Sequence, residues 1–276
     1  MKRVGFLLAA LLCIAISNVT VPAQSVDSFS DGNFTSNPAW TGDTANWTIV
    51  ANSDVAAGAT GSNTLRSNGP GGGGGSRQLR TQIADWSAQQ SWGFFVGRRG
   101  QPFTAANQMI IWLYANEADL LSATVDGYRL VIGDNAGDDE IRLQSVTNGV
   151  GATILTSSGA LINGLTDIGF LVRVTRTSTG SFTLYTSILP TSNGTGAIAT
   201  DFPNDTNVTV NQGSITDTTI TPAANGFFGA VAINSGGAGT TDAVELDQIE
   251  LVAAPTAVNL ISFDALSDES GRVLLQ

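Results

Sequence analysis

Three acidic residues near the C-terminal end of the sequence, Glu245, Asp247 and Glu250, follow the spacing E-x-D-x-x-E. Carboxylates placed together on one strand face can act as nucleophile and general acid/base in glycoside hydrolysis. In a regular strand Glu245 and Asp247 face one way and Glu250 faces the other. A one-residue bulge near Gln248 would bring the three together. The same bulge would turn the apolar residues of the segment to the opposite face: Val244, Leu246, Ile249 and Leu251. The apolar pattern therefore predicts a bulge with or without catalysis.

The composition excludes most other catalytic chemistry. The sequence contains no His, one Cys and one Lys, and the Cys and the Lys both lie within the first 13 residues. A remainder without these residue types cannot form a Ser-His-Asp or Cys-His nucleophile, a Cys/His zinc site, a Walker-type phosphate loop or a Schiff base. We therefore expect no enzyme, or an enzyme that works with carboxylates alone.

Acidic residues also suggest a metal site. Asp27 and Asp31 are close in sequence, and the first and last strands of a β-sandwich usually lie together, which would add Asp242 or Asp247. Carboxylate oxygens are hard ligands that suit Ca²⁺. Calcium bound by Asp27, Asp31 and Asp247 is our prediction for a cofactor, and solvated acidic turns are the alternative.

Tryptophan side chains could form a stacking platform for a sugar ring. The candidates are Trp86, Trp92 and Trp112. Trp92 and Trp112 lie in apolar runs that look like core strands, so burial is the competing interpretation for both. Trp86 has polar neighbours and is the best candidate for an exposed ring.

The first 23 residues have the layout of a secretory signal peptide. Lys2 and Arg3 precede an apolar run over residues 4–16, and small residues at Val21 and Ala23 predict cleavage before Gln24. A run of this length is shorter than the roughly 20 residues that span a bilayer. We expect a secreted or cell-surface protein that does not insert into a membrane after cleavage.

The charge of the exported chain restricts its partners. The whole sequence has a net charge of −11, and losing Lys2 and Arg3 makes the remainder more acidic still. Nucleic acids and anionic membranes would be repelled by such a surface. An extracellular glycan or a surface protein is the expected partner.

The rest of the sequence is typical of an all-β protein. It contains 32 Gly and only 13% charged residues. Apolar and alternating runs between turn residues predict strands over 46–50, 78–83, 91–98, 108–114, 127–133, 140–146, 168–175, 181–188, 226–234 and 243–252. Hairpins are expected over 127–146 and 168–188, and residues 116–122 look briefly helical. About ten strands without βαβ alternation predict a two-sheet antiparallel jelly-roll sandwich.

A second boundary falls at Ala254-Pro255. Residues 256–263 and 272–276 read as the first two strands of another module, and two strands alone are not independently stable. The expected organisation is a signal peptide over 1–23, a sandwich over 24–254, and a linker with the truncated start of a further β-sandwich over 255–276.

Three segments resemble the concanavalin A-like lectin/glucanase and laminin-G family of jelly rolls: FSDGNFTSNPAWTGD over 29–43, DGYRLVIG over 126–133 and LDQIEL over 246–251. More narrowly, the sequence resembles the N-terminal domain of large secreted bacterial surface proteins with lamin-tail or fibronectin-III-like modules. The resemblance covers about residues 27–252. It implies an accessory or adhesive domain more than an enzyme.

The E-x-D-x-x-E string is also similar to the catalytic strand of laminarinase-type glycosidases. In that family the strand lies in the middle of the domain, whereas Glu245–Glu250 closes it. Three hypotheses follow: a non-catalytic binding or adhesion module, a structural spacer domain, and a laminarinase-like glycoside hydrolase using Glu245, Asp247 and Glu250.

Overall fold

The computed structural model describes most of the predicted sandwich. The described residues are 24–51, 63–67, 75–84, 90–98, 102–133, 139–158, 161–166, 168–188, 208, 210–221, 223, 225–234, 243–253, 265–267 and 273–275. Apart from one short 3-10 helix, η1 (Thr44–Asn46), the regular elements among them are strands. None of the described residues belongs to a helix long and apolar enough to cross a membrane.

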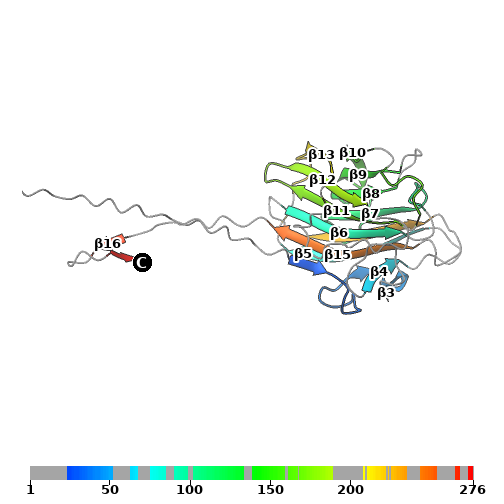
Figure 1. The fold of residues 1–276 in the computed structure, drawn as a ribbon, viewed down its shortest axis with the longest axis horizontal. Coiled ribbons are helices and arrows are strands. Elements are labelled where there is room, and N and C mark those ends of the chain that lie inside the picture. The colour runs from blue at the N-terminus through cyan, green and yellow to red at the C-terminus, as the bar shows by residue number, and fades with distance from the viewer. Residues whose placement is uncertain are drawn as a thin grey trace, which may run out of the picture. The chain divides into compact units, whose positions relative to one another are not determined.

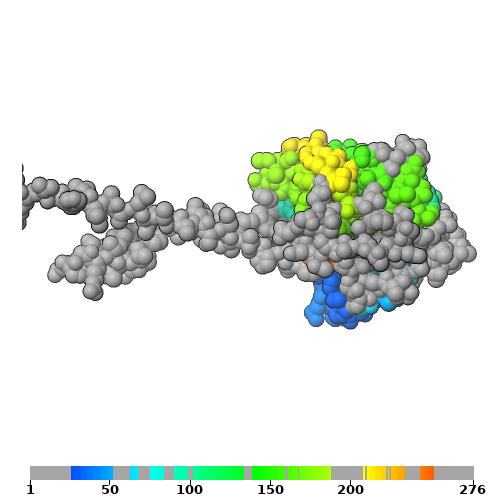
Figure 2. All heavy atoms as spheres, in the orientation of Figure 1, coloured from blue at the N-terminus to red at the C-terminus, as the bar shows by residue number. Residues whose placement is uncertain are grey.

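The strands of the sandwich form two antiparallel sheets (Figure 1). Sheet A runs in the order β13 (Val210–Thr216), β12 (Ser181–Ile188), β11 (Ile168–Arg176), β6 (Gln90–Arg98), β15 (Val244–Ala253), β4 (Asn63–Ser67), β3 (Trp47–Ala51), and β1 (Gln24–Asp27) also pairs with β15. Sheet B runs in the order β10 (Val150–Thr156), β9 (Ile141–Thr147), β8 (Gly127–Ile132), β7 (Gln108–Ala115), β14 (Asn225–Asn234), β5 (Gly75–Ala84), β2 (Thr41–Gly42). In the space-filling view the N-terminal strands, in blue, and β13, in yellow, lie at opposite ends of the sandwich (Figure 2). The predicted all-β sandwich is confirmed.

Each of the ten predicted strands corresponds to a strand of the structure. Of the strands in the two sheets, the prediction missed β1, β2, β4, β10 and β13, and it was wrong about a helix over 116–122, where the chain forms bends and turns. Strands β10 and β13 are the outermost strands of their sheets, and most of their residues are at least partly exposed. An edge strand that buries neither face lacks the apolar alternation by which strands are recognised.

Both predicted hairpins are present. Strands β8 and β9 pair from Gly127↔Val146 to Ile132↔Ile141, and β11 pairs with β12. The second turn closes at Gly180, which has a φ of 81°. A Cβ at this position would lie 2.7 Å from the carbonyl oxygen of Asp217. Glycine is therefore required there by both backbone conformation and space.

The core fills the space between the two sheets. Alternate residues of β6, β11 and β15 in sheet A face alternate residues of β5, β7, β8 and β14 in sheet B. Aromatic rings connect the layers: Phe94 of β6 lies 6.2 Å from Phe228 of β14, and Phe228 lies the same distance from Trp40. Burial of these large side chains compensates for the absence of disulfides in the sandwich.

The C-terminal segment has its own pair of strands, β16 (Ala265–Ser267) and β17 (Val273–Leu275). The predicted strand over 256–263 and the predicted signal peptide over 1–23 lie outside the described residues. The division into leader, sandwich and truncated module therefore remains a prediction.

Candidate functional site

Strand β15 carries the acidic string and contains the predicted bulge. It pairs with β6 through Asp247↔Phe95 and then Glu250↔Gly93, so the register shifts by one residue between them. Gln248 takes up the extra residue with a φ of 49°, which is rare outside glycine. All four apolar residues predicted to face inward lie in the core: Val244, Leu246, Ile249 and Leu251. The bulge therefore places Glu245, Asp247 and Glu250 together on the outer face of sheet A.

Glu245 is fully buried and ion-paired. Arg66 of the neighbouring strand β4 donates hydrogen bonds from Nε at 3.1 Å and from Nη2 at 2.9 Å to Glu245 Oε1. The carboxylate also lies over Gly97, where a Cβ would approach Oε2 to 2.7 Å. A side chain larger than glycine at 97 would displace the ion pair.

Asp247 lies next to Asp27, because β1 pairs with β15 as expected for first and last strands. Asp247 accepts hydrogen bonds from the Gln248 N–H at 2.8 Å and from Thr64 Oγ1 at 3.3 Å. Burial raises the pKa of Asp247 to about 8, and the charge of Asp27 contributes in the same direction.

The carboxylate of Asp27 accepts one hydrogen bond from the backbone and one from a buried tryptophan. Its Oδ1 accepts from the Phe29 N–H at 2.7 Å and its Oδ2 accepts from Trp40 Nε1 at 2.8 Å. Burial raises the pKa of Asp27 to about 6, and these hydrogen bonds together oppose the rise. Both aspartates therefore favour the protonated form more than exposed carboxyl groups do.

These surroundings do not favour catalysis by the acidic string. Glu245 and Asp247 have no exposed surface. A catalytic carboxylate must come within hydrogen-bonding reach of its substrate. The arrangement of the three carboxylates is instead explained by the bulge, the ion pair to Arg66 and the contact with β1.

The predicted calcium ligands are only partly brought together. The charge of Asp31 helps to raise the pKa of Asp27, and the charge of Asp27 helps to raise the pKa of Asp247, so the three carboxyl groups lie in one region. Asp31 is exposed, however, and its Oδ1 accepts from the Asn33 N–H at 2.9 Å. Within the described ranges, no group of three acidic side chains is arranged to hold a metal ion. Calcium remains a prediction.

Two of the three tryptophans predicted to contact a sugar are buried. Trp92 is 1% exposed and packs in the core between the sheets, and Trp112 is 0% exposed. Neither indole offers a face on which a sugar could stack, so burial, the competing interpretation, describes both. Trp86 lies outside the described residues.

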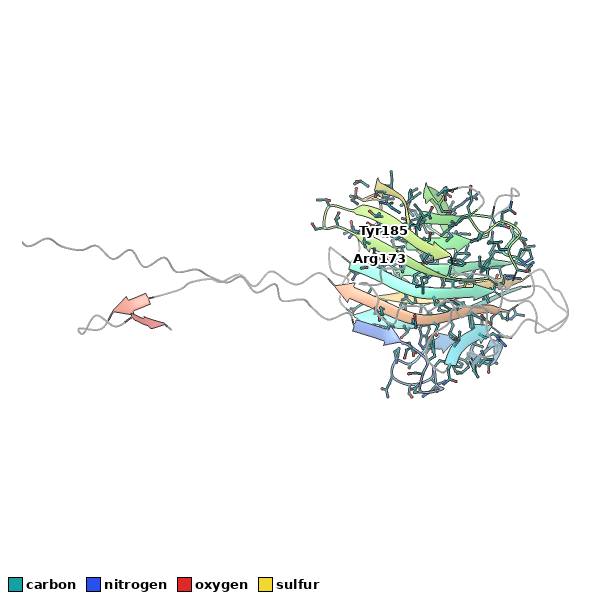
Figure 3. All side chains as sticks on the ribbon, viewed as in Figure 1. Arg173 and Tyr185 are labelled. Carbon is teal, nitrogen blue, oxygen red and sulfur yellow. The ribbon has the colours of Figure 1, made fainter. Side chains whose placement is uncertain are left out.

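The outer face of sheet A has an apolar cluster beside the acidic string. Phe95, Leu171 and Val208 are buried together, and Tyr185 packs against them. Figure 3 labels Tyr185 and its cross-strand neighbour Arg173, whose guanidinium carbon lies 4.5 Å from the tyrosine ring centroid. Arg173 Nη2 also donates to the Val208 carbonyl at 3.3 Å. Val208 thus packs on this face.

The outer face of sheet B carries a row of side chains that sequence reasoning missed. Gly229 of β14, Trp112 of β7, Arg129 of β8 and Gln144 of β9 are cross-strand neighbours in that order. We call these four residues the Arg129 row. The Arg129 guanidinium lies over the indole, 5.3 Å from its centroid. A fully buried tryptophan thus supports a partly exposed arginine.

The loop after β7 covers part of the same face. Gln78 of β5 donates to Asp119 Oδ1 at 2.8 Å and accepts from the Leu120 N–H at 2.8 Å, which fixes the loop on the sheet. Leu120 lies over Gly229, where a Cβ would approach its Cδ1 to 2.6 Å. Leu120 and Val125 complete an apolar cluster with Trp112. Arg129 therefore lies at the margin of this apolar cover.

Solved structures establish the fold. The exoplasmic/lumenal domain of VIP36, in a form bound to Ca²⁺ and Man3GlcNAc, is similar with a TM-score of 0.52 over 79% of this chain and 88% of that one, at 11% identity. The protein has the concanavalin A-like, legume-lectin type of sandwich. The carbohydrate recognition domain of Emp47p is similar with a TM-score of 0.50, covering 75% of this chain and 87% of that chain at 9% identity.

A metal-free form of the Emp46p carbohydrate recognition domain gives a TM-score of 0.50 at 8% identity, over 83% of this chain and 95% of that one. No protein-family model matches the sequence, and no curated protein is significantly similar to it. These comparisons establish the fold alone.

Proposed function

We propose that this protein is a secreted, non-catalytic module that binds an extracellular glycan. The observation that carries the proposal is the sandwich it has in common with the VIP36 domain, whose structure was solved with Man3GlcNAc bound. Lectin-type sandwiches use the same architecture for different ligands, so the ligand must come from the residues of this chain. Burial of Glu245 and Asp247 favours binding over hydrolysis.

The outer face of sheet B is the surface we assign to the ligand. It presents the partly exposed polar side chains of Arg129 and Gln144 beside a buried apolar base. Sugar sites combine such a base with a few fixed hydrogen-bonding groups. The outer face of sheet A is less suited, because Val208 covers Phe95 and Leu171.

A glycan array tests the function. We expect the full chain without residues 1–23 to bind at least one class of immobilised glycan, with no release of reducing sugar from β-glucans. Running the array with calcium and with a chelator checks the predicted ion, since loss of binding in chelator would support Asp27, Asp31 and Asp247 as ligands. The absence of binding to every glycan would contradict the proposal and favour the spacer hypothesis.

Hydrolysis of a β-glucan would revive the enzyme hypothesis instead. In that case Glu245→Gln and Glu250→Gln should each abolish the activity. Activity that survives both substitutions would assign the chemistry to other residues.

Export is the second part of the proposal. We expect the protein recovered from the medium of an expressing bacterium to begin at Gln24, because Val21 and Ala23 supply the small residues read at cleavage. Intact mass spectrometry measures this directly. A product that retains Met1 and stays in the cells would contradict secretion.

A further inference from the structure

The Arg129 row holds a guanidinium in one fixed orientation. Arg129 Nε donates to Gln144 Oε1 at 2.9 Å, and Gln144 Nε2 in turn donates to Thr153 Oγ1 of β10 at 3.4 Å. The plane of the side chain is supported from below by Trp112. Such a clamp removes the rotamer freedom that an arginine otherwise loses when it binds a ligand.

Gly151 of β10 provides the space that the guanidinium occupies. A Cβ at this position would lie 2.6 Å from Arg129 Nη2 and would also meet the Gln144 amide. Even alanine would therefore push the arginine and the glutamine out of place. The glycine thus preserves the position of the terminal nitrogens.

The positive charge of Arg129 is not balanced locally. In the part of the chain that the structure describes, its contacts are with Gln144 and Trp112, and neither is acidic. Burial lowers the pKa of Arg129, and no acidic neighbour opposes the shift. By contrast, Arg142 on the same face pairs with Glu140 at 3.2 Å.

Trp112 supports the arginine and is itself closed to a ligand. Its Nε1 is buried and makes no hydrogen bond within the described residues. Because the indole is 0% exposed, the group that the row offers to a ligand is the guanidinium of Arg129.

The chemistry that fits this row is an anionic group with several acceptor oxygens. With Nε committed to Gln144, the terminal nitrogens remain as a fork that matches two oxygens of a carboxylate or sulfate. The protein as a whole is acidic, with a net charge of −11, so it does not attract anions in general. An anion bound here would be held by this specific site.

We propose that the Arg129 row binds the carboxylate or sulfate group of an acidic saccharide on the outer face of sheet B. The proposal rests on the glycan-binding function proposed above and names its ligand class. Uronic acids and sulfated sugars are the saccharides with this chemistry. The neighbouring Thr153, which is exposed, supplies a hydroxyl for the rest of the sugar.

Calorimetric titration with three probes tests the proposal on the full chain without residues 1–23. The probes are a 1,4-linked uronic acid tetrasaccharide, the neutral tetrasaccharide made by reducing its carboxyl groups, and sodium sulfate. We expect the acidic tetrasaccharide to bind at least tenfold more tightly than the neutral one. Raising the salt concentration should weaken the acidic complex and leave the neutral one nearly unchanged.

Three substitutions locate the site. Arg129→Gln should weaken binding of the acidic tetrasaccharide at least tenfold, equivalent to about 1.4 kcal/mol. Gly151→Ala should weaken it as well, although it keeps every charge, because the new Cβ displaces Nη2. Arg142→Gln is the matched control on the same face and should change the affinity less than threefold.

The outcomes separate this proposal from the general function. Equal affinity for both tetrasaccharides, unchanged in Arg129→Gln, would overturn the Arg129 row as the site while leaving glycan binding intact. Arg129-dependent binding of sulfate, without binding of either tetrasaccharide, would also overturn it, because the row would then be a simple anion site. If no glycan on the array and neither tetrasaccharide binds, both the Arg129 site and the proposed glycan-binding function are contradicted.

Discussion

Replacing Asp247 by Asn is expected to stabilise the protein at pH 8 and to remove most of the pH dependence of its stability between pH 6 and 8. The folded protein raises the pKa of Asp247 from 3.8 to about 8. Between these values the folded state holds a proton that the unfolded chain has released. The free energy of unfolding therefore falls by up to about 1.4 kcal/mol per pH unit as the pH rises.

The free energy of unfolding falls with rising pH because folding raises the pKa of this acid. The favourable contribution is fully present below about pH 4 and is lost as the pH rises through about 8. Asn is neutral throughout, keeps an acceptor for the Gln248 N–H and can donate to Thr64 Oγ1. Asp27, with a pKa of about 6, should leave a smaller slope between pH 4 and 6 in the variant.

Urea unfolding followed by tryptophan fluorescence at pH 5, 6.5 and 8 measures the effect. Asp119→Asn is a control of opposite sign. Its hydrogen bonds from Gln78 and Leu121 lower the pKa of Asp119, so its contribution is lost only below about pH 4, and Asp119→Asn should leave the slope between pH 6 and 8 unchanged. A slope between pH 6 and 8 that is unchanged in Asp247→Asn would show that Asp247 is ionised in the fold.

Replacing Arg66 by Ala is expected to destabilise the sandwich by about 3–5 kcal/mol, because it leaves the buried carboxylate of Glu245 without its two charged hydrogen bonds. The effect should exceed that of an ordinary surface substitution several-fold. Denaturant unfolding at pH 7 measures it.

The matched control for this ion pair is Arg142→Ala. The Arg142–Glu140 pair is more exposed than the Arg66–Glu245 pair, so we expect a loss below about 1 kcal/mol. Replacing both Arg66 and Glu245 by Met should restore much of the stability, because the buried carboxylate is removed together with the arginine that pairs with it. A loss in Arg66→Ala no larger than in Arg142→Ala would contradict the assignment.

Local sequence pattern was sufficient for most of the strands that bury a face, although the short strand β4, with Leu65 fully buried, was missed. It was also sufficient for the bulge in β15, because only one extra residue near Gln248 reconciles the inward positions of Leu246 and Ile249. Edge strands β10 and β13 were missed for the opposite reason: their residues are exposed and show no alternation.

The candidate sites depended on register, which a single sequence does not reveal. Trp112 lies in an apolar run, and nothing local indicates that it faces outward under Arg129, which follows it 17 positions later in the chain. The burial of Glu245 likewise depends on Arg66, which is 179 residues away. Fold class was therefore predictable, whereas the surroundings of each charged side chain were not.

The bulge at Gln248 has a consequence for how such sequences are annotated. In this protein E-x-D-x-x-E occurs in a bulged strand that is buried on both faces. The alternation of its apolar residues shifts by one position at the bulge. Those six letters resemble the catalytic string of laminarinase-type glycosidases, although Glu245 and Asp247 are fully buried. Apolar residues precede, interrupt and follow the string here, at Val244, Leu246, Ile249 and Leu251. The same apolar positions in another sequence would indicate that the string belongs to a bulged core strand, and this can be checked before an activity is assigned.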